Sequence, residues 1–428
     1  GGGFGSLLAA HARVRKRRKT APGTAPVDKD AKAAREVMWV PTIEELRQMA
    51  ARVPARPNGV KAIKVAPVVR KSGFVTTPFL QKPTRHAGAW HSDEWLQSID
   101  PPSCGLGNKL FMYCAYRLYS LFFRKRFAFH SSSWLASEYR LVRGVDYQGS
   151  KEVEELLDRQ VIGVATHQIR SVMTMCTMYL QWSPLICVHA RLVYSWCSNL
   201  VAGALAAAIK QYGKDDGGDG IEPSLVVHLR TGDIWGAHVQ SADVRSGGFA
   251  FYAQPPVWFY GWLMRQSKRI GAPKTVVIVT EKVDSPYAQA VRIALEAEGG
   301  TVQLRSNSSL ADFGLLLRAT HLVTSVSTFS WWGAFLGNHK LRENIENGLC
   351  AVGTRRTVYA PLAGYFHPHS MHKSQCRFSF DDGSDGGCCD TFEFELRKND
   401  LWRNTNAQRK EVLCFQTPAW FTDKYGDS

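Results

Sequence analysis

From residue 224 onward, short apolar runs alternate with segments of helical periodicity, and this alternation constrains the fold more than any other feature. The first run, Ser224-Leu-Val-Val-His-Leu-Arg230, is continuous, as in strands that a parallel sheet buries on both faces. Comparable runs, separated by helical segments, are expected as strands at 275–280, 301–304, 321–324 and 357–361. Strands that alternate with helices predict a doubly wound α/β fold.

A polar, glycine-rich linker at Gly213–Gly220 divides the body of the chain. It separates an N-terminal α/β half, residues 88–212, from a second half, residues 221–375, which we expect to bind a nucleotide sugar. The first half should contain a helix that begins at Gly105 and a short strand at 126–130. The expected fold class is therefore α/β, with two facing Rossmann-like halves and a basic N-terminal arm.

Both ends of the chain differ from this body. Residues 1–87 form the basic arm, with one short helix that Thr42 and Glu45 begin as a capping box. A helix in such an arm should dock onto the body or onto a partner. Residues 376–428 form a C-terminal extension, in which 391–396 alternates like an edge strand.

Three short motifs occur in a fixed order: Gly105-Leu-Gly-Asn-Lys-Leu-Phe-Met-Tyr-Cys114, His228-Leu-Arg-Thr-Gly-Asp233 and Ser327-Thr-Phe-Ser-Trp-Trp-Gly-Ala-Phe-Leu336. The first and third begin helices, whose N-terminal amides favour anions. The second places Arg230 at the carboxyl edge of the sheet, where ligands of open α/β sheets bind. A guanidinium can pair with two phosphate oxygens. Together the motifs predict a basic, phosphate-facing site.

Each motif also has a structural explanation. Arg230 could pair with Asp233 at the end of its strand, and Ser327 could be an ordinary helix cap whose following tryptophans lie in the core. His228 could donate to a phosphate or a base, or satisfy a buried backbone group. Asp312 could cap the helix near which it lies. The residues alone leave these alternatives open, and a cap can hold an anion while the tryptophans pack.

The order and spacing of the motifs resemble glycosyltransferase family 11, the α-1,2-fucosyltransferases, over about residues 104–368. Members of that family carry Gly-Leu-Gly-Asn-Gln, His-x-Arg-Arg-Gly-Asp and Ser-Thr-Phe-Ser-Trp-Trp-Gly-Ala. The resemblance implies an enzyme with two facing Rossmann-like halves of the glycosyltransferase-B type. It would transfer fucose from GDP-fucose to a glycan or protein acceptor, with inversion and without a metal. GDP-fucose is a substrate, so no cofactor is expected.

The resemblance also implies roles for individual residues. The first arginine of the family's second motif binds the donor diphosphate, and Arg230 is its match. From its place at a helix N-terminus, Asn108 could hydrogen-bond a phosphate oxygen or the sugar, and Arg230 and Asn108 are the expected catalytic residues. Asp312 would help to hold the nucleotide end of the donor. The residues expected to bind the donor are Gly105, Gly107, Asn108, His228, Arg230, Asp312, Ser327, Thr328 and Phe329.

Some positions depart from the family pattern. Cys104 replaces a glycine, Lys109 a glutamine and Val326 an asparagine, and a Phe-Ser-Asp-Asp segment of the family is Val279-Thr-Glu-Lys282 here. Thr231 replaces the second arginine, which removes a cation from the diphosphate site. These departures are compatible with a different donor, with reduced activity or with no activity.

Other polar residues define little chemistry. The base that would deprotonate the acceptor is unassigned, with His238, Asp243 and Glu281 as candidates. No metal site is expected, because the chain has no repeated Cys-x-x-Cys pair and no acidic metal motif at a strand end. Its 10 cysteines could form disulfides in a secretory compartment, but their spacing favours structural thiols.

The basic arm supports an alternative function. Residues 1–75 hold 16 Lys and Arg against 5 Asp and Glu, which leaves +5 of the total +16 charge for the rest. The arm could be a solvated tail, a targeting remnant or a segment that binds a polyanion. If the arm binds a polyanion, the chain would be a structural subunit of a large organellar assembly, such as one that contains RNA. It would then keep a glycosyltransferase fold with reduced activity or none.

The compartment follows from the function. An active enzyme whose anchor has been removed would work in the Golgi lumen, whereas a structural subunit would belong to the mitochondrion or another organelle. We expect no transmembrane span, because no stretch reaches the ~18 uninterrupted apolar residues of a spanning helix. The best candidate, Leu200–Ile209, is short and alanine-rich and indicates a packed helix.

Overall fold

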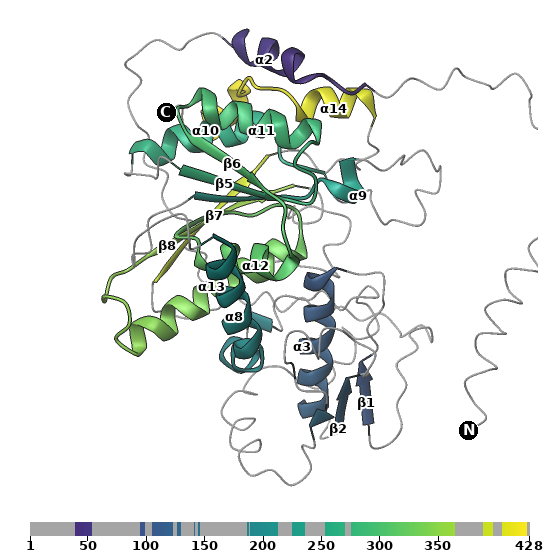
Figure 1. Ribbon diagram of the computed structural model, residues 1–428, viewed down its shortest axis with the longest axis vertical. Coiled ribbons are helices and arrows are strands. Elements are labelled where there is room, and N and C mark those ends of the chain that lie inside the picture. The colour runs from purple at the N-terminus through teal and green to yellow at the C-terminus, as the bar shows by residue number, and fades with distance from the viewer. Residues whose placement is uncertain are drawn as a thin grey trace, which may run out of the picture. The chain divides into compact units, whose positions relative to one another are not determined.

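The chain of the computed structural model divides into two units, Gly1–Trp39 and Val40–Ser428, and the helices and strands labelled in Figure 1 belong to the second. The structure describes residues 39–53, 95–98, 105–122, 126–129, 141, 144–145, 186–187, 189–212, 225–235, 253–269, 275–363, 388–396 and 405–425. Almost all of them belong to the second unit. The linker at 213–220 and most of the arm at 1–87 lie outside the described residues.

A six-stranded sheet of order β6-β5-β4-β7-β8-β9 organises the second unit, and every neighbouring pair is parallel. Its strands are β4 (Leu225–Leu229), β5 (Thr275–Thr280), β6 (Thr301–Arg305), β7 (His321–Val323), β8 (Arg356–Leu362) and β9 (Cys389–Glu395). Every residue of β4 and β8 is buried, as expected for strands inside a parallel sheet with helices on both faces. The predicted parallel α/β sheet is confirmed.

Helices cover both faces of this sheet. Figure 1 shows α10 and α11 on one face and α12, α13 and α8 on the other. Their bounds are Val257–Arg269, Pro286–Ala297, Ser309–Arg318, Thr328–Glu346 and Ala190–Tyr212, respectively. Serine residues cap the N-terminal ends of α11 and α12. Ser285 Oγ accepts from the Ala288 amide at 3.1 Å, and Ser308 Oγ accepts from the Ala311 amide at 3.2 Å. Short helices α9 (Gly232–Trp235), α14 (Asn406–Val412) and α15 (Ala419–Tyr425) complete this part.

The predicted helix of the arm is α2 (Ile43–Ala51), and the capping box of Thr42 and Glu45 is present. The amide of Glu45 donates to Thr42 Oγ1 at 3.2 Å, and the amide of Thr42 donates to Glu45 Oε2 at 2.7 Å. The helix packs against α11 and buries Leu46 completely. The arm helix therefore docks onto the body of the protein.

A second, smaller sheet has the order β1-β2-β3 and lies beside α3 (Leu106–Phe122). Its strands are β1 (Trp95–Ser98), β2 (Arg126–Phe129) and β3 (Gly144–Val145). β1 and β2 are parallel, whereas β2 and β3 are antiparallel. The predicted helix from Gly105 and the short strand near 126–130 are both present.

Two elements outside the predicted range 221–375 belong to the layers of the large sheet, and one of them is the edge strand predicted at 391–396. β9 falls in the predicted extension 376–428, yet seven of its residues pair with β8, so it forms an edge of the sheet. Its alternating pattern reflects that edge position. Helix α8 was assigned to the half 88–212, yet it packs against α12 and α13. The contact is close, because a Cβ on Gly314 of α12 would overlap the carbonyl group of Ala204 on α8.

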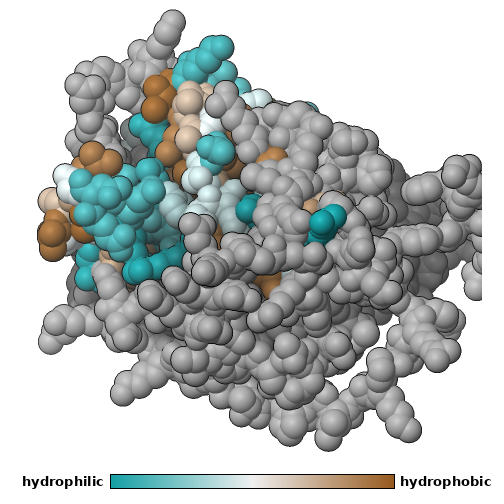
Figure 2. Space-filling view, turned by 90° about the horizontal axis from the view of Figure 1, so that it is seen from below, coloured by the Kyte–Doolittle hydropathy of each residue, from teal (hydrophilic) through white to brown (hydrophobic). Residues whose placement is uncertain are grey.

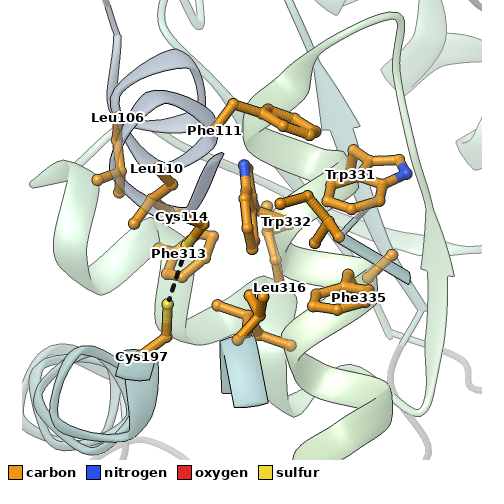
Figure 3. Packing of buried hydrophobic residues seen from close by; sticks show 14 of the residues in the cluster. Leu106, Leu110, Phe111, Cys114, Cys197, Phe313, Leu316, Trp331, Trp332 and Phe335 are labelled. Atoms are coloured by element: carbon orange, nitrogen blue, oxygen red, sulfur yellow. Dashed lines mark hydrogen bonds between the residues drawn. The ribbon is translucent and has the colours of Figure 1, made fainter. Parts of the chain in front are cut away.

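Aromatic side chains fill the core between α3 and α13 (Figure 3). Phe111 lies with its ring centroid 4.9 Å from Trp331 and 5.0 Å from Trp332, and Trp331 stacks on Phe335 at 5.1 Å. All four are buried, so the tryptophans of the third motif are core residues. One hydrophobic core thus extends from α3 through α13 to the large sheet.

The described surface has few continuous apolar areas on the face in Figure 2, where hydrophilic residues surround small hydrophobic patches. Among the described residues, α8 alone is long and apolar enough to cross a membrane. One side of α8 is buried against the protein, which is also what a core helix requires. Of the apolar window of α8, 39% is buried inside the protein.

Candidate anion-binding site

The carboxyl edge of the large sheet brings the predicted site residues together. Leu229 is opposite Thr280 in the pairing of β4 with β5, so Arg230 and Glu281 follow neighbouring strand ends. Val323 of β7 is opposite Val227, which places the segment after β7 beside His228. Parallel strands end at one edge, and loops from different strands therefore meet there.

The first and third motifs are in direct contact at the start of α3 and α13. Thr328 Oγ1 donates to Asn108 Oδ1 at 2.8 Å, and Trp332 Nε1 donates to the Gly107 carbonyl oxygen at 3.0 Å. A Cβ on Gly107 would lie 2.5 Å from the Phe329 amide nitrogen. Only glycine permits this approach, so the N-terminal ends of two helices meet at the sheet edge.

Hydroxyl groups order the start of α13. Ser327 is the N-cap, and its Oγ accepts from the Phe329 amide at 3.3 Å. Ser330 Oγ donates to the carbonyl oxygens of Ser325 and Ser327, and it accepts from the Ser325 amide at 3.2 Å. The structural explanation of Ser327 as a helix cap is therefore realised. The cap holds the positive end of α13 at the sheet edge.

His228 joins β4 to this segment. Its Nδ1 is 2.7 Å from Ser325 Oγ, and its ring centroid is 5.4 Å from that of Phe329. Burial lowers the pKa of His228 to about 4 from an ordinary 6.5, with Glu281 opposing this shift and Arg230 adding to it. His228 is therefore neutral at pH 7. Partly exposed Arg230 is near enough to act on that pKa and is a permanent cation of the edge.

Replacing His228 with asparagine should make the protein less sensitive to acid. Above pH 6.5 His228 is neutral in both states, but between pH 6.5 and 4 the unfolded chain takes up a proton that the folded one refuses. This proton uptake lowers the free energy of unfolding by up to about 1.4 kcal/mol per pH unit. Asparagine does not titrate and still offers Ser325 a polar partner. Urea unfolding from pH 7 to 4.5 should show a shallower loss in His228→Asn.

His189 does not obscure that comparison. Burial also lowers its pKa to about 4, and it is unchanged in both proteins. Asp312 has a raised pKa that acts in the opposite direction, again in both. Equal pH dependence of wild type and His228→Asn would show that His228 is not buried as the structure has it.

Glu281 connects the loops after β4 and β5. Its Oε2 accepts from the amides of Thr231 at 2.8 Å and Gly232 at 3.1 Å. Thr231 Oγ1 lies 2.7 Å from Thr280 Oγ1 and accepts from the Lys282 amide at 3.1 Å. The buried side chain of Thr231 therefore links the loop after β4 to the loop after β5, and Glu281 orders the loop that follows Arg230. The base candidates His238 and Asp243 lie outside the described residues.

Asp312 lies in the first turn of α12 and makes buried hydrogen bonds. Its Oδ1 accepts from the Tyr212 hydroxyl at 2.9 Å, and its Oδ2 accepts from the Asn307 amide at 3.1 Å. Burial raises the pKa of Asp312, the bonds from Asn307 and Tyr212 lower it, and the charge of Glu281 raises it further. The carboxyl groups of Asp312 and Glu281 are therefore near enough for the charge of Glu281 to act on Asp312.

The structure thus brings most of the predicted residues together. Gly107 and Asn108 contact the Ser327–Phe329 segment, and His228 contacts Phe329. Gly105 precedes α3, and its carbonyl oxygen accepts from the amides of Asn108 at 3.1 Å and Lys109 at 3.2 Å. Asp312 is next to Phe313, whose ring centroid is 5.3 Å from that of Phe329. For Asp233, the side chain lies outside the described part.

Sequence reasoning did not assign Ser325 or the indole of Trp332 to this edge. Ser325 had no motif of its own, and only the pairing of β7 with β4 puts it beside His228. Trp332 was expected in the core, and its buried ring also carries a donor that reaches Gly107. Within the described ranges, no cluster of three or more His, Cys, Asp or Glu could hold a metal ion.

A scan against protein-family models finds no match, and a search of curated protein sequences also finds none. The geometry of the edge and the motifs that form it are therefore the basis for a functional assignment.

Proposed function

We propose that this chain is a fucosyltransferase-like glycosyltransferase that moves fucose from GDP-fucose to a glycan or protein acceptor, with inversion and without a metal. The observation that carries the proposal is the meeting of all three motifs at one sheet edge. Thr328 of the third motif donates to Asn108 of the first at 2.8 Å, and the ring of His228 of the second lies 5.4 Å from that of Phe329.

The electrostatics of the edge suit a leaving diphosphate. Each helix N-terminus is equivalent to roughly +0.5 of an elementary charge, and α3 and α13 bring two of them together. Arg230 adds a full charge that can pair with two phosphate oxygens. Fixed donors of this kind stabilise the charge that develops as the sugar–phosphate bond breaks. Asn108 would orient a phosphate oxygen or the sugar beside them.

The carboxyl group of Asp312 would act at the other end of the donor. It accepts hydrogen bonds from Tyr212 and Asn307, and its negative charge makes it a poor neighbour for phosphate. Carboxylates accept hydrogen bonds from hydroxyl groups, as on a ribose. We therefore place the nucleoside toward Asp312 and the diphosphate toward Arg230.

We further propose that α3 and the β1-β2-β3 sheet are the described part of a second Rossmann-like half, which makes the protein a glycosyltransferase of the B type. The support is that this part supplies Gly107 and Asn108 to an edge that the large sheet otherwise forms. The acceptor would then approach from a different side than the donor nucleotide. An enzyme of this kind belongs in the Golgi lumen.

The alternative is a structural subunit that retains the fold without the reaction. The polar groups of this edge form hydrogen bonds with one another. Asn108 accepts a hydrogen bond from Thr328, and Glu281 accepts hydrogen bonds from the amides of Thr231 and Gly232. Such bonds stabilise the fold without any ligand. Residues 1–75, with a net charge of +11, would then bind RNA or a large organellar assembly, as in a mitochondrion.

A transfer assay tests the enzyme directly. Full-length protein with GDP-fucose and a mixture of terminal galactosides should release GDP and form a fucosylated product, whereas GDP-mannose serves as the control donor. Addition of EDTA should leave the rate unchanged, because the cations of the site belong to the protein. A rate that EDTA abolishes and Mn²⁺ restores would contradict the metal-independent mechanism.

A further inference from the structure

Two buried cysteines face each other between α3 and α8. In Figure 3, the side chain of Cys114 points from α3 toward that of Cys197 on α8. Their Sγ atoms are 3.9 Å apart, and neither side chain is exposed. The two residues are 83 positions apart in the chain, so the tertiary fold alone makes them neighbours.

We propose that Cys114 and Cys197 form an intrachain disulfide bond when the protein folds under oxidising conditions. A disulfide has an S–S distance of about 2.05 Å, so the sulfur atoms must approach by about 2 Å. Because the two sulfur atoms face each other, rotation of the side chains acts along the direction of the bond. The bond would join α3, whose first turn contains Gly107 and Asn108, to α8, which packs against α12.

The oxidant in this step is a disulfide of a small thiol or of a thiol–disulfide exchange protein. The thiolate of one cysteine attacks that disulfide, forms a mixed disulfide and releases one thiol. The thiolate of the second cysteine then attacks the mixed disulfide, and the second thiol of the oxidant leaves. Two cysteine thiols are thereby oxidised, and one external disulfide is reduced to two thiols.

The bond must form before the core closes. Burial raises the pKa of the Cys114 thiol well above its ordinary value, so the thiolate is scarce once the protein has folded. A folded, reduced protein should therefore resist oxidation, and the compartment in which the chain folds decides its state. This inference does not depend on the donor or on catalysis.

Peptide mapping tests the pairing in the full-length chain. Protein refolded with oxidised and reduced glutathione is denatured in iodoacetamide without reduction, digested and analysed by mass spectrometry. We expect the peptides of Cys114 and Cys197 to appear as one linked species that reduction separates. Cys350, partly exposed after α13, should carry the alkyl group in the same sample. Alkylated Cys114 and Cys197 would overturn the proposal, and they would then pack only as apolar thiols.

Thermal melting measures what the bond does. A cross-link that closes a loop of this length should raise the melting temperature of the oxidised protein by roughly 5–10 °C over the reduced protein. Cys197→Ala should lose this difference, and the matched variant Cys350→Ala should keep it. A difference that persists in Cys197→Ala would assign the effect to other cysteines and overturn the pairing.

Discussion

Replacing Gly107 with alanine should lower the free energy of unfolding by about 3 kcal/mol or more and abolish binding of the donor nucleotide. A Cβ at this position would lie 2.5 Å from the Phe329 amide nitrogen and 2.6 Å from Thr328 Oγ1. The obstruction is mainly backbone, so no side-chain rotation can relieve it. The start of α3 must then move away from α13, which breaks the bonds of Thr328 to Asn108 and of Trp332 to Gly107.

Gly105→Ala is the matched control for this variant. Gly105 belongs to the same motif, but a Cβ there meets no atom within 4 Å. The control should change the free energy of unfolding by less than about 1 kcal/mol, because the added Cβ meets no atom. Urea unfolding compares the stability of the two variants, and nucleotide titration compares Gly107→Ala with the wild type. A Gly107→Ala protein as stable as Gly105→Ala would show that the two helices do not meet.

Replacing Arg230 with alanine should weaken binding of GDP by about 10- to 100-fold while leaving the fold intact. Arg230 follows β4 and is partly exposed at the sheet edge, so its loss removes a charge from the site rather than packing from the core. Arg230→Lys should be intermediate, because an ammonium keeps the charge but cannot form the paired donors of a guanidinium.

Arg318→Ala controls for the loss of a positive charge. Arg318 is exposed in the last turn of α12, away from the N-terminal ends that form the site. Its removal should leave GDP binding unchanged. Equal binding by Arg230→Ala and Arg318→Ala would remove Arg230 from the diphosphate site, whatever the activity of the protein.

Local patterns in the sequence predicted the large sheet well. The strands β4 to β8 begin and end within a few residues of their predicted positions, because each is a short apolar run with its own pattern. The capping box of Thr42 and Glu45 likewise predicted where the arm helix begins. The place of β9 was not predictable in this way, because an alternating strand does not reveal its partner.

Contacts between distant segments account for what the sequence did not show. Arg356 begins β8 and is buried, with its guanidinium donating to the carbonyl oxygens of Leu316 and Leu317 at the end of α12. Burial lowers the pKa of Arg356 to about 10. No sequence motif contains Arg356. The hydrogen bond from the Thr231 amide to Glu281 likewise has no motif that would have predicted it. Such roles depend on which loops the sheet brings together.

Calorimetric titration of the full-length protein with GDP, in low salt and with EDTA present, is the most direct test of the central claim. If the three motifs form a diphosphate site, the titration should show saturable binding at one site. That binding should weaken at higher ionic strength, because Arg230 and the helix ends act through charge. No heat with millimolar GDP and folded protein would contradict the claim and leave the structural subunit as the better account.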